Sequence, residues 1–227
     1  YQFSTYVGDM LALLGALQFA GPIRSFDWVG TSMGGLIGLT LAGVPELPLP
    51  ALLHRLVLND VGPVIEWAAL QRIGQYLGKS GTFPTVEAAA ASMRAISAGF
   101  GPHTDDKWLA LSRPMLRPTP DGAWRLHYDP AIAVPYAALT PEASAEGEAA
   151  LWQMYDRVTA ETLVLRGADS DLLSAATADA MRVRGPRPRV VSFAGVGHAP
   201  TLVAADQVAA VLDFLLPAPA TPRDDAR

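Results

Sequence analysis

The stretch FDWVGTSMGGLIGLTLAG, Phe26 to Gly43, has the pattern of a buried strand, a glycine-rich corner and a closely packed helix. Ser32 lies at the corner, two residues from Gly30 and two from Gly34. A sharp strand-to-helix turn holds such a serine in a strained conformation, clear of the sheet, and leaves room only for glycine beside it. The pattern therefore predicts either a nucleophilic serine or a corner chosen only for close packing, and these residues alone do not choose.

A serine nucleophile needs a histidine within hydrogen-bond reach, and the chain has four histidines. His54 opens a strand, His103 lies in a loop beside a proline, and His127 lies in a region of helical pattern. His198 lies in AGVGHAPTL, a glycine-bracketed loop after the last strand. Because ligands and catalysis gather at the carboxyl ends of parallel strands, we predict that His198 is the base.

Three aspartates are candidates for the acid that orients this histidine. Asp169 and Asp171 follow one strand in LVLRGADSDLLS, and Asp60 follows another in LVLNDVGP. Each is also a turn-forming or helix-capping residue by type. The chain order serine, acid, histidine holds for all three and does not decide among them.

Four short apolar strands are expected, in RSFDWVG, HRLVLNDVG, ETLVLRGADSD and PRVVSFAG. Helical patterns separate them, and a further amphipathic helix over residues 7–17 precedes the first. Alternating strands and helices predict an α/β fold with a parallel sheet covered on both faces.

Residues 63–158 interrupt this alternation with a run of helix-like pieces. We therefore expect part of a core in residues 1–62, a helical cap in residues 63–158 and the rest of the core in residues 159–216. The last segment, residues 217–227, has no periodicity and is predicted to be a disordered tail.

Composition excludes several function classes. Half of the 227 residues are hydrophobic, and 17 basic against 22 acidic residues give a net charge of -5 without any basic block, so nucleic acid is not an expected partner. The chain has no cysteine, which excludes disulfides, thiolate catalysis and cysteine-ligated metals. No uninterrupted apolar run reaches roughly 18 to 20 residues, so we expect no membrane span. We predict a cytoplasmic location.

The chain resembles the α/β-hydrolase family, and more narrowly its bacterial members with a helical cap. The matching pieces are DWVGTSMGG, LVLNDVGP, LVLRGADSDLLS and GVGHAP, which occur in the family's order along almost the whole chain. The resemblance implies an α/β-hydrolase fold, Ser32 as nucleophile, His198 as general base and the backbone N–H of Met33 as an oxyanion donor.

For the acid, the resemblance implies Asp171, because similar proteins have SDLLS at that place. Asp169 is the reserve candidate, and Asp60 is assigned a structural role. Family members also have strands and an HG loop before the segment where this chain starts, and that loop supplies a second oxyanion donor. Since the sequence opens at Tyr1 without these parts, we expect an N-terminally truncated fragment with little activity of its own.

The predicted function is hydrolysis of a small apolar carboxylic ester or related acyl compound, with an acyl-enzyme and no cofactor. Two other activities are open on the same fold, a hydrolase of carbon–carbon bonds in ring-cleavage products and a lactonase. An alternative of another class is a non-catalytic binding module. The sequence gives no indication of oligomeric state.

Overall fold

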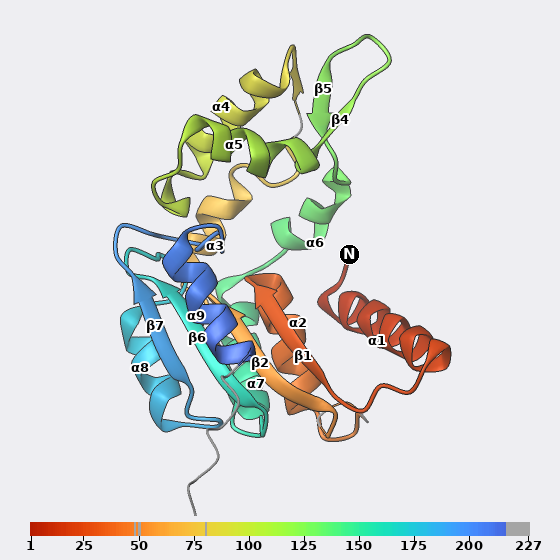
Figure 1. Cartoon of the computed structure of the whole chain (residues 1–227), viewed down its shortest axis with the longest axis vertical. Coiled ribbons are helices and arrows are strands. Elements are labelled where there is room, and N and C mark those ends of the chain that lie inside the picture. The colour runs from red at the N-terminus through yellow and green to blue at the C-terminus, as the bar shows by residue number, and fades with distance from the viewer. Residues whose placement is uncertain (48, 50, 80, 217–227) are drawn as a thin grey trace, which may run out of the picture.

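The computed structural model describes residues 1–47, 49, 51–79 and 81–216, so the predicted tail lies outside the described residues. Its core is a parallel four-stranded sheet in the order β1-β2-β6-β7 (Figure 1). The strands are β1 (Phe26–Thr31), β2 (Leu53–Asn59), β6 (Glu161–Gly167) and β7 (Arg189–Phe193). The four predicted strands and their parallel sheet are confirmed.

Helices cover both faces of this sheet. These helices are α2 (Met33–Gly43), α7 (Pro141–Tyr155), α8 (Ala175–Val183) and α9 (Ala205–Leu215). Helix α1 (Phe3–Ala20) packs against α2 and has no buried residue. On one face, Leu56 and Leu58 pack in a cluster with residues of α2, α7 and α8. On the other face, Val57 packs in a cluster with Phe214 of α9. This alternation is the period of two that a strand requires.

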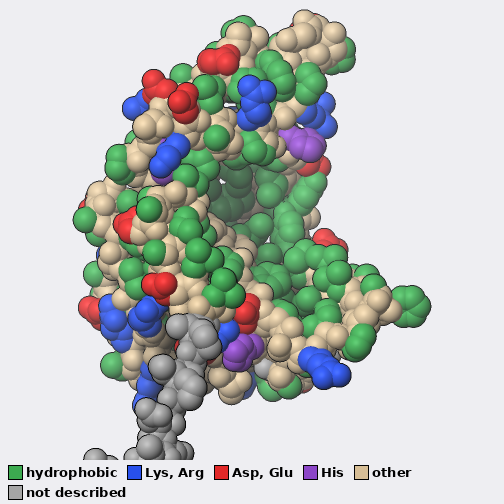
Figure 2. Space-filling model, viewed as in Figure 1, with side chains coloured by type: hydrophobic (Ala, Val, Ile, Leu, Met, Phe, Trp, Pro, Cys, Tyr) green, Lys and Arg blue, Asp and Glu red, His purple; other side chains and the backbone are tan. Residues whose placement is uncertain are grey.

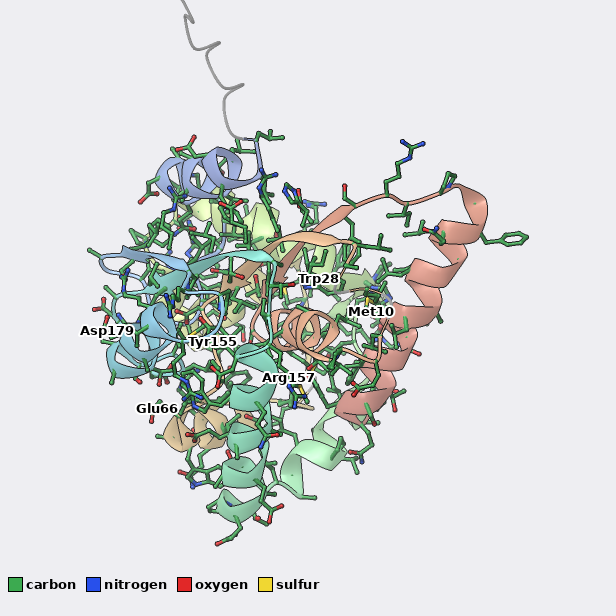
Figure 3. All side chains as sticks on the ribbon, turned by 90° about the horizontal axis from the view of Figure 1, so that it is seen from below. Met10, Trp28, Glu66, Tyr155, Arg157 and Asp179 are labelled. Atoms are coloured by element: carbon green, nitrogen blue, oxygen red, sulfur yellow. The ribbon has the colours of Figure 1, made fainter. Side chains whose placement is uncertain are left out.

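Helix α2 lies unusually close to its neighbours because small residues face them. A side chain at Gly38 would overlap the Trp28 ring, and one at Gly43 would overlap the backbone of Met154 in α7. Figure 3 shows Trp28 and Met10 beside this helix, and both pack in the cluster that joins α1 to α2. The expectation of a helix packed tightly on the sheet is confirmed.

Helix α1 is the one element of the described chain long and apolar enough to cross a membrane by length and composition. We did not expect this from the sequence, because polar residues interrupt each apolar run, but over its 18 residues α1 is apolar on average. Core helices of soluble proteins and N-terminal signal sequences share this length and apolar composition. In this structure Met10 and Leu14 of α1 pack beside Ile37 and Leu41 of α2.

Elements between β2 and α7 lie above the carboxyl ends of the core strands, in the upper half of Figure 1. This upper layer contains α3 (Trp67–Gly74), β3 (Thr82–Phe83), α4 (Val86–Ile96), α5 (Asp105–Ser112), β4 (Leu116–Pro118), β5 (Trp124–Leu126) and α6 (Ala133–Ala137), with 3₁₀ turns at Ala98–Phe100, Arg113–Met115 and Pro130–Ile132. We call residues 67–137 the cap.

The cap differs from the expected insertion in two ways. It contains a small antiparallel sheet in the order β3-β5-β4, which the sequence did not indicate because its strands are two or three residues long. In addition, α7 packs on α2 of the core, although its residues fall within the range 63–158. The predicted division of the chain into core residues 1–62, cap residues 63–158 and core residues 159–216 stays a prediction.

Candidate active site

Ser32 follows β1 and precedes α2, with φ 52° and ψ -122°, a backbone conformation that residues other than glycine rarely adopt. Its N–H donates to the carbonyl of Asn59 at 3.1 Å. A side chain at Gly30 would overlap the Gly34 backbone, and one at Gly35 would lie 2.5 Å from Val61 Cγ1. A side chain at Gly34 would meet nothing within 4 Å. The crowding that we predicted at Gly34 is therefore found at Gly35 instead.

His198 lies in the loop after β7, and its side chain is only 11% exposed. Its Nε2 is 3.0 Å from Ser32 Oγ. This is within the hydrogen-bond distance that a base needs to accept the hydroxyl proton. Its Nδ1 is 2.8 Å from Asp60 Oδ2. Because a carboxylate only accepts, Nδ1 carries the proton and Nε2 is free to accept from the serine.

Asp60 directly follows β2 and is fully buried, with φ 55°. Besides the His198 contact, its carboxylate accepts from Gly167 N–H at 2.8 Å and from the Ser170 hydroxyl at 2.6 Å. Three donors therefore hold this buried carboxylate in one orientation.

Asp171, the aspartate expected to orient the histidine, does not contact it. Its two carboxylate oxygens accept from Nε and Nη2 of Arg72 in the cap, at 2.6 and 2.9 Å. Burial acts to raise the pKa of this carboxyl, but the hydrogen bonds and charge of Arg72 outweigh it and leave the pKa below its usual value. The expected contact between Asp171 and His198 is therefore absent from this structure, and Asp60, which was expected to be only structural, makes that contact instead.

Asp169, the reserve candidate, is exposed and contributes its backbone N–H to the Val196 carbonyl at 2.9 Å. The reason for both errors is the order of the strands. Strand β2 is hydrogen-bonded to β1, whereas β6 is one strand further away. The aspartate after β2 therefore lies closer to the serine corner.

Met33 is the first residue of α2, so its N–H has no acceptor within the helix and lies beside the serine. This position fits the role of oxyanion donor that the resemblance implies for Met33. That role stays a prediction, and so does the second oxyanion donor. Among the residues that the structure describes, no group of three or more His, Asp or Glu side chains could hold a metal ion.

Three further residues of the site were not predicted from the sequence. Ser170 donates to Asp60, and the fully buried Asn59 contacts the loop that contains His198. Gly167 has to be glycine, because a side chain there would overlap the backbone of Val196 and Gly197. A polar residue after a strand or a strand-ending glycine is too common to predict such roles.

The cap contacts the histidine loop directly. Gly99 accepts a hydrogen bond from Gly197 N–H at 2.6 Å, and His103 Nε2 is 3.0 Å from Thr201 Oγ1. His103 also packs edge-on against Trp108. His103 therefore connects the cap to the core, whereas we expected a loop residue without such a role. Figure 2 shows a hollow between the upper and lower halves with mainly hydrophobic walls.

The family model described as alpha/beta hydrolase family matches residues 1–211. The chain belongs to the α/β-hydrolase family. A 3-hydroxybutyrate-oligomer hydrolase from Cupriavidus necator is 45% identical over 217 residues, which cover 94% of this chain and 71% of that protein. This family membership and the named relative identify the chain as an enzyme of the ester-hydrolase type.

Solved α/β-hydrolase structures are also similar to this chain. One from Novosphingobium aromaticivorans is 34% identical with a TM-score of 0.81, and the match covers 95% of this chain and 72% of that one. An esterase from Mycobacterium tuberculosis is 25% identical with a TM-score of 0.59, covering 85% of this chain and 60% of that one. Both agree with the observed sheet and helix arrangement.

Proposed function

We propose that this α/β hydrolase cleaves carboxylic esters by nucleophilic catalysis, with Ser32 as nucleophile, His198 as base and Asp60 as the acid that orients the imidazole. The observation that supports this most strongly is the continuous chain of contacts from Ser32 Oγ to His198 at 3.0 Å and from His198 to Asp60 at 2.8 Å. Nucleophile, base and orienting group in this order are what a weakly nucleophilic hydroxyl needs.

In the first half of the reaction, Ser32 Oγ bonds to the ester carbonyl carbon while His198 Nε2 takes the hydroxyl proton. The negative charge that develops on the carbonyl oxygen is stabilised by the Met33 N–H and by the N-terminal end of α2. When the carbon–oxygen bond of the ester breaks, the imidazolium gives its proton to the alcohol, which leaves. The acyl group stays on Ser32.

In the second half, His198 takes a proton from water, and the hydroxide oxygen bonds to the acyl carbon. Collapse of this second tetrahedral intermediate breaks the bond to Ser32 Oγ, which regains its proton from His198. Asp60 keeps the imidazole in the Nδ1-protonated form and stabilises its positive charge in both halves.

As substrate class we propose short esters of hydroxy acids, including oligomers of 3-hydroxybutyrate. The support is the named relative, which is 45% identical over most of this chain. We further propose that a chain of methyl-bearing ester units binds in the hollow of Figure 2, whose walls are mainly apolar.

The test, carried out on the full-length protein, is turnover of 3-hydroxybutyrate dimers and trimers beside p-nitrophenyl esters, a lactone and a ring-cleavage diketone. We expect release of hydroxy acid monomers, and labelling by a fluorophosphonate probe that Ser32→Ala abolishes. Exclusive turnover of the lactone or the diketone would support the alternative activities. Labelling that persists in Ser32→Ala would refute the nucleophile assignment, and a protein with neither turnover nor labelling would fit the non-catalytic alternative.

A further inference from the structure

Asn59 is the last residue of β2, is fully buried, and directly precedes Asp60. Its carbonyl accepts the N–H of Ser32 at 3.1 Å. Its side-chain Nδ2 donates to Thr31 Oγ1 at 2.9 Å and to the Pro200 carbonyl at 2.8 Å. One residue thus contacts the serine corner and the histidine loop, and is bonded covalently to the acid.

Chemistry fixes the orientation of this amide. The Pro200 carbonyl can only accept, so the nitrogen of Asn59 has to face it; the reversed amide would place two acceptors 2.8 Å apart. A side chain of equal size without a donor, such as aspartate or leucine, cannot make this contact. The requirement is therefore for a donor and not for volume alone.

The contact with Pro200 holds the histidine loop on one side of His198. On the other side, Gly197 N–H donates to Gly99 in the cap at 2.6 Å. His198 lies between these two attachments, and its Nε2 is 3.0 Å from Ser32 Oγ. Loss of the Pro200 attachment frees the loop to move away from the serine corner.

We propose that Asn59 is a positioning residue, which sets the distance between Ser32 Oγ and His198 Nε2 by holding the Pro200 carbonyl. The catalytic part of this inference rests on the proposed function. Asn59 is buried beneath the triad and acts through the loop, without touching substrate.

The kinetic test uses two variants of the same shape, Asn59→Leu and Asn59→Asp. Since a misplacement of about 1 Å costs on the order of 100-fold, we expect kcat on a p-nitrophenyl ester to fall by about 10- to 100-fold. KM should stay within about twofold of the wild type, because no substrate contact is lost. The rate of fluorophosphonate labelling should fall by the same factor as kcat.

The pH profile separates positioning from loss of the acid. In Asn59→Leu the acidic limb of kcat/KM should keep its midpoint, because the contact between Asp60 and His198 is retained. A raised KM with unchanged kcat, or kcat within about twofold of the wild type in both variants, would overturn the proposal.

Thr40→Val is the matched control for a buried hydrogen bond lost elsewhere. The Thr40 hydroxyl donates to the Leu36 carbonyl within α2 at 2.9 Å and touches no member of the triad. We expect its kcat to equal that of the wild type. A kcat loss in Thr40→Val as large as that in Asn59→Leu would assign the effect to general destabilisation and overturn the proposal.

A crystal structure of Asn59→Leu tests placement independently of activity. We expect the distance from Ser32 Oγ to His198 Nε2 to exceed about 3.5 Å, beyond hydrogen-bond reach. An unchanged distance would overturn the proposal even if the wild type hydrolyses esters. A wild type without esterase activity, together with a lengthened distance in the variant, would refute only the proposed function. Asn59→Asp serves for the same measurement if Asn59→Leu does not fold.

Discussion

Ser170 holds Asp60, the proposed acid, since its hydroxyl donates to Asp60 Oδ2 at 2.6 Å. Ser170→Ala removes one of the three donors that hold the Asp60 carboxylate, and since a misplacement of about 1 Å costs on the order of 100-fold, kcat should fall by roughly 10-fold or more. The same hydroxyl accepts from Leu172 and Leu173 N–H, so some stability is lost as well. Steady-state kinetics on a p-nitrophenyl ester measure the first effect and thermal unfolding the second.

Ser174→Ala is the control for this prediction. Ser174 caps α8 by accepting from Thr177 N–H at 3.2 Å, so its loss should cost about 1 kcal/mol of stability without changing kcat. Equal kcat in Ser170→Ala and Ser174→Ala would contradict a role for Ser170 in holding the acid.

The two glycines two residues either side of Ser32 should respond oppositely to alanine. A Cβ at Gly30 would overlap the Gly34 backbone, which cannot move without disturbing the corner, whereas a Cβ at Gly34 has open space. Gly30→Ala should therefore cost several kcal/mol, more than the roughly 1 to 3 kcal/mol typical of overpacking. Gly34→Ala should leave the thermal transition unchanged or slightly raised, because alanine favours helix over glycine. Equal transition temperatures of the two variants would refute this steric account of the corner.

At the scale of elements, His103 links the cap to the histidine loop and makes their contact sensitive to pH. Burial lowers the pKa of His103, nearby Lys107 lowers it further, and the Phe100 carbonyl opposes them. The folded protein therefore favours the neutral imidazole, while the unfolded chain protonates near pH 6.5. The unfolded state binds more protons below that pH, so this contribution is fully present above about pH 6.5 and is lost as the pH falls.

Thermal unfolding between pH 8 and 5 tests this prediction with His103→Gln, which keeps a donor toward Thr201 but does not titrate. The transition temperature of the wild type should fall more on acidification than that of the variant. Parallel curves would show that His103 keeps the same protonation in both states, against the prediction.

At the scale of the whole molecule, the features that are local in sequence were predictable. The four core strands, the serine corner and the loop of His198 follow from short apolar runs bounded by glycine and turn residues. The antiparallel sheet of the cap was not, because strands of two or three residues show no period.

The contacts of Asp60, the proposed acid, depend on the order of the strands in space. Asp60, Asp169 and Asp171 all follow strands and precede His198, so chain order did not separate them. Only the pairing of β2 with β1 brings the loop after β2 to the serine corner. The bond from Asn59 to Pro200 joins residues 141 positions apart, a contact that no pattern in one segment predicts.

The central claim, that Asp60 and not Asp171 orients His198, is tested most directly by kcat of Asp60→Asn beside Asp171→Asn on one ester substrate. Loss of the orienting carboxylate allows the wrong imidazole tautomer, so Asp60→Asn should lower kcat by about 10³- to 10⁴-fold. Asp171→Asn removes only an exposed ion pair with Arg72 and should keep kcat within about threefold. The opposite result, with Asp171→Asn inactive and Asp60→Asn near the wild type, would contradict the account.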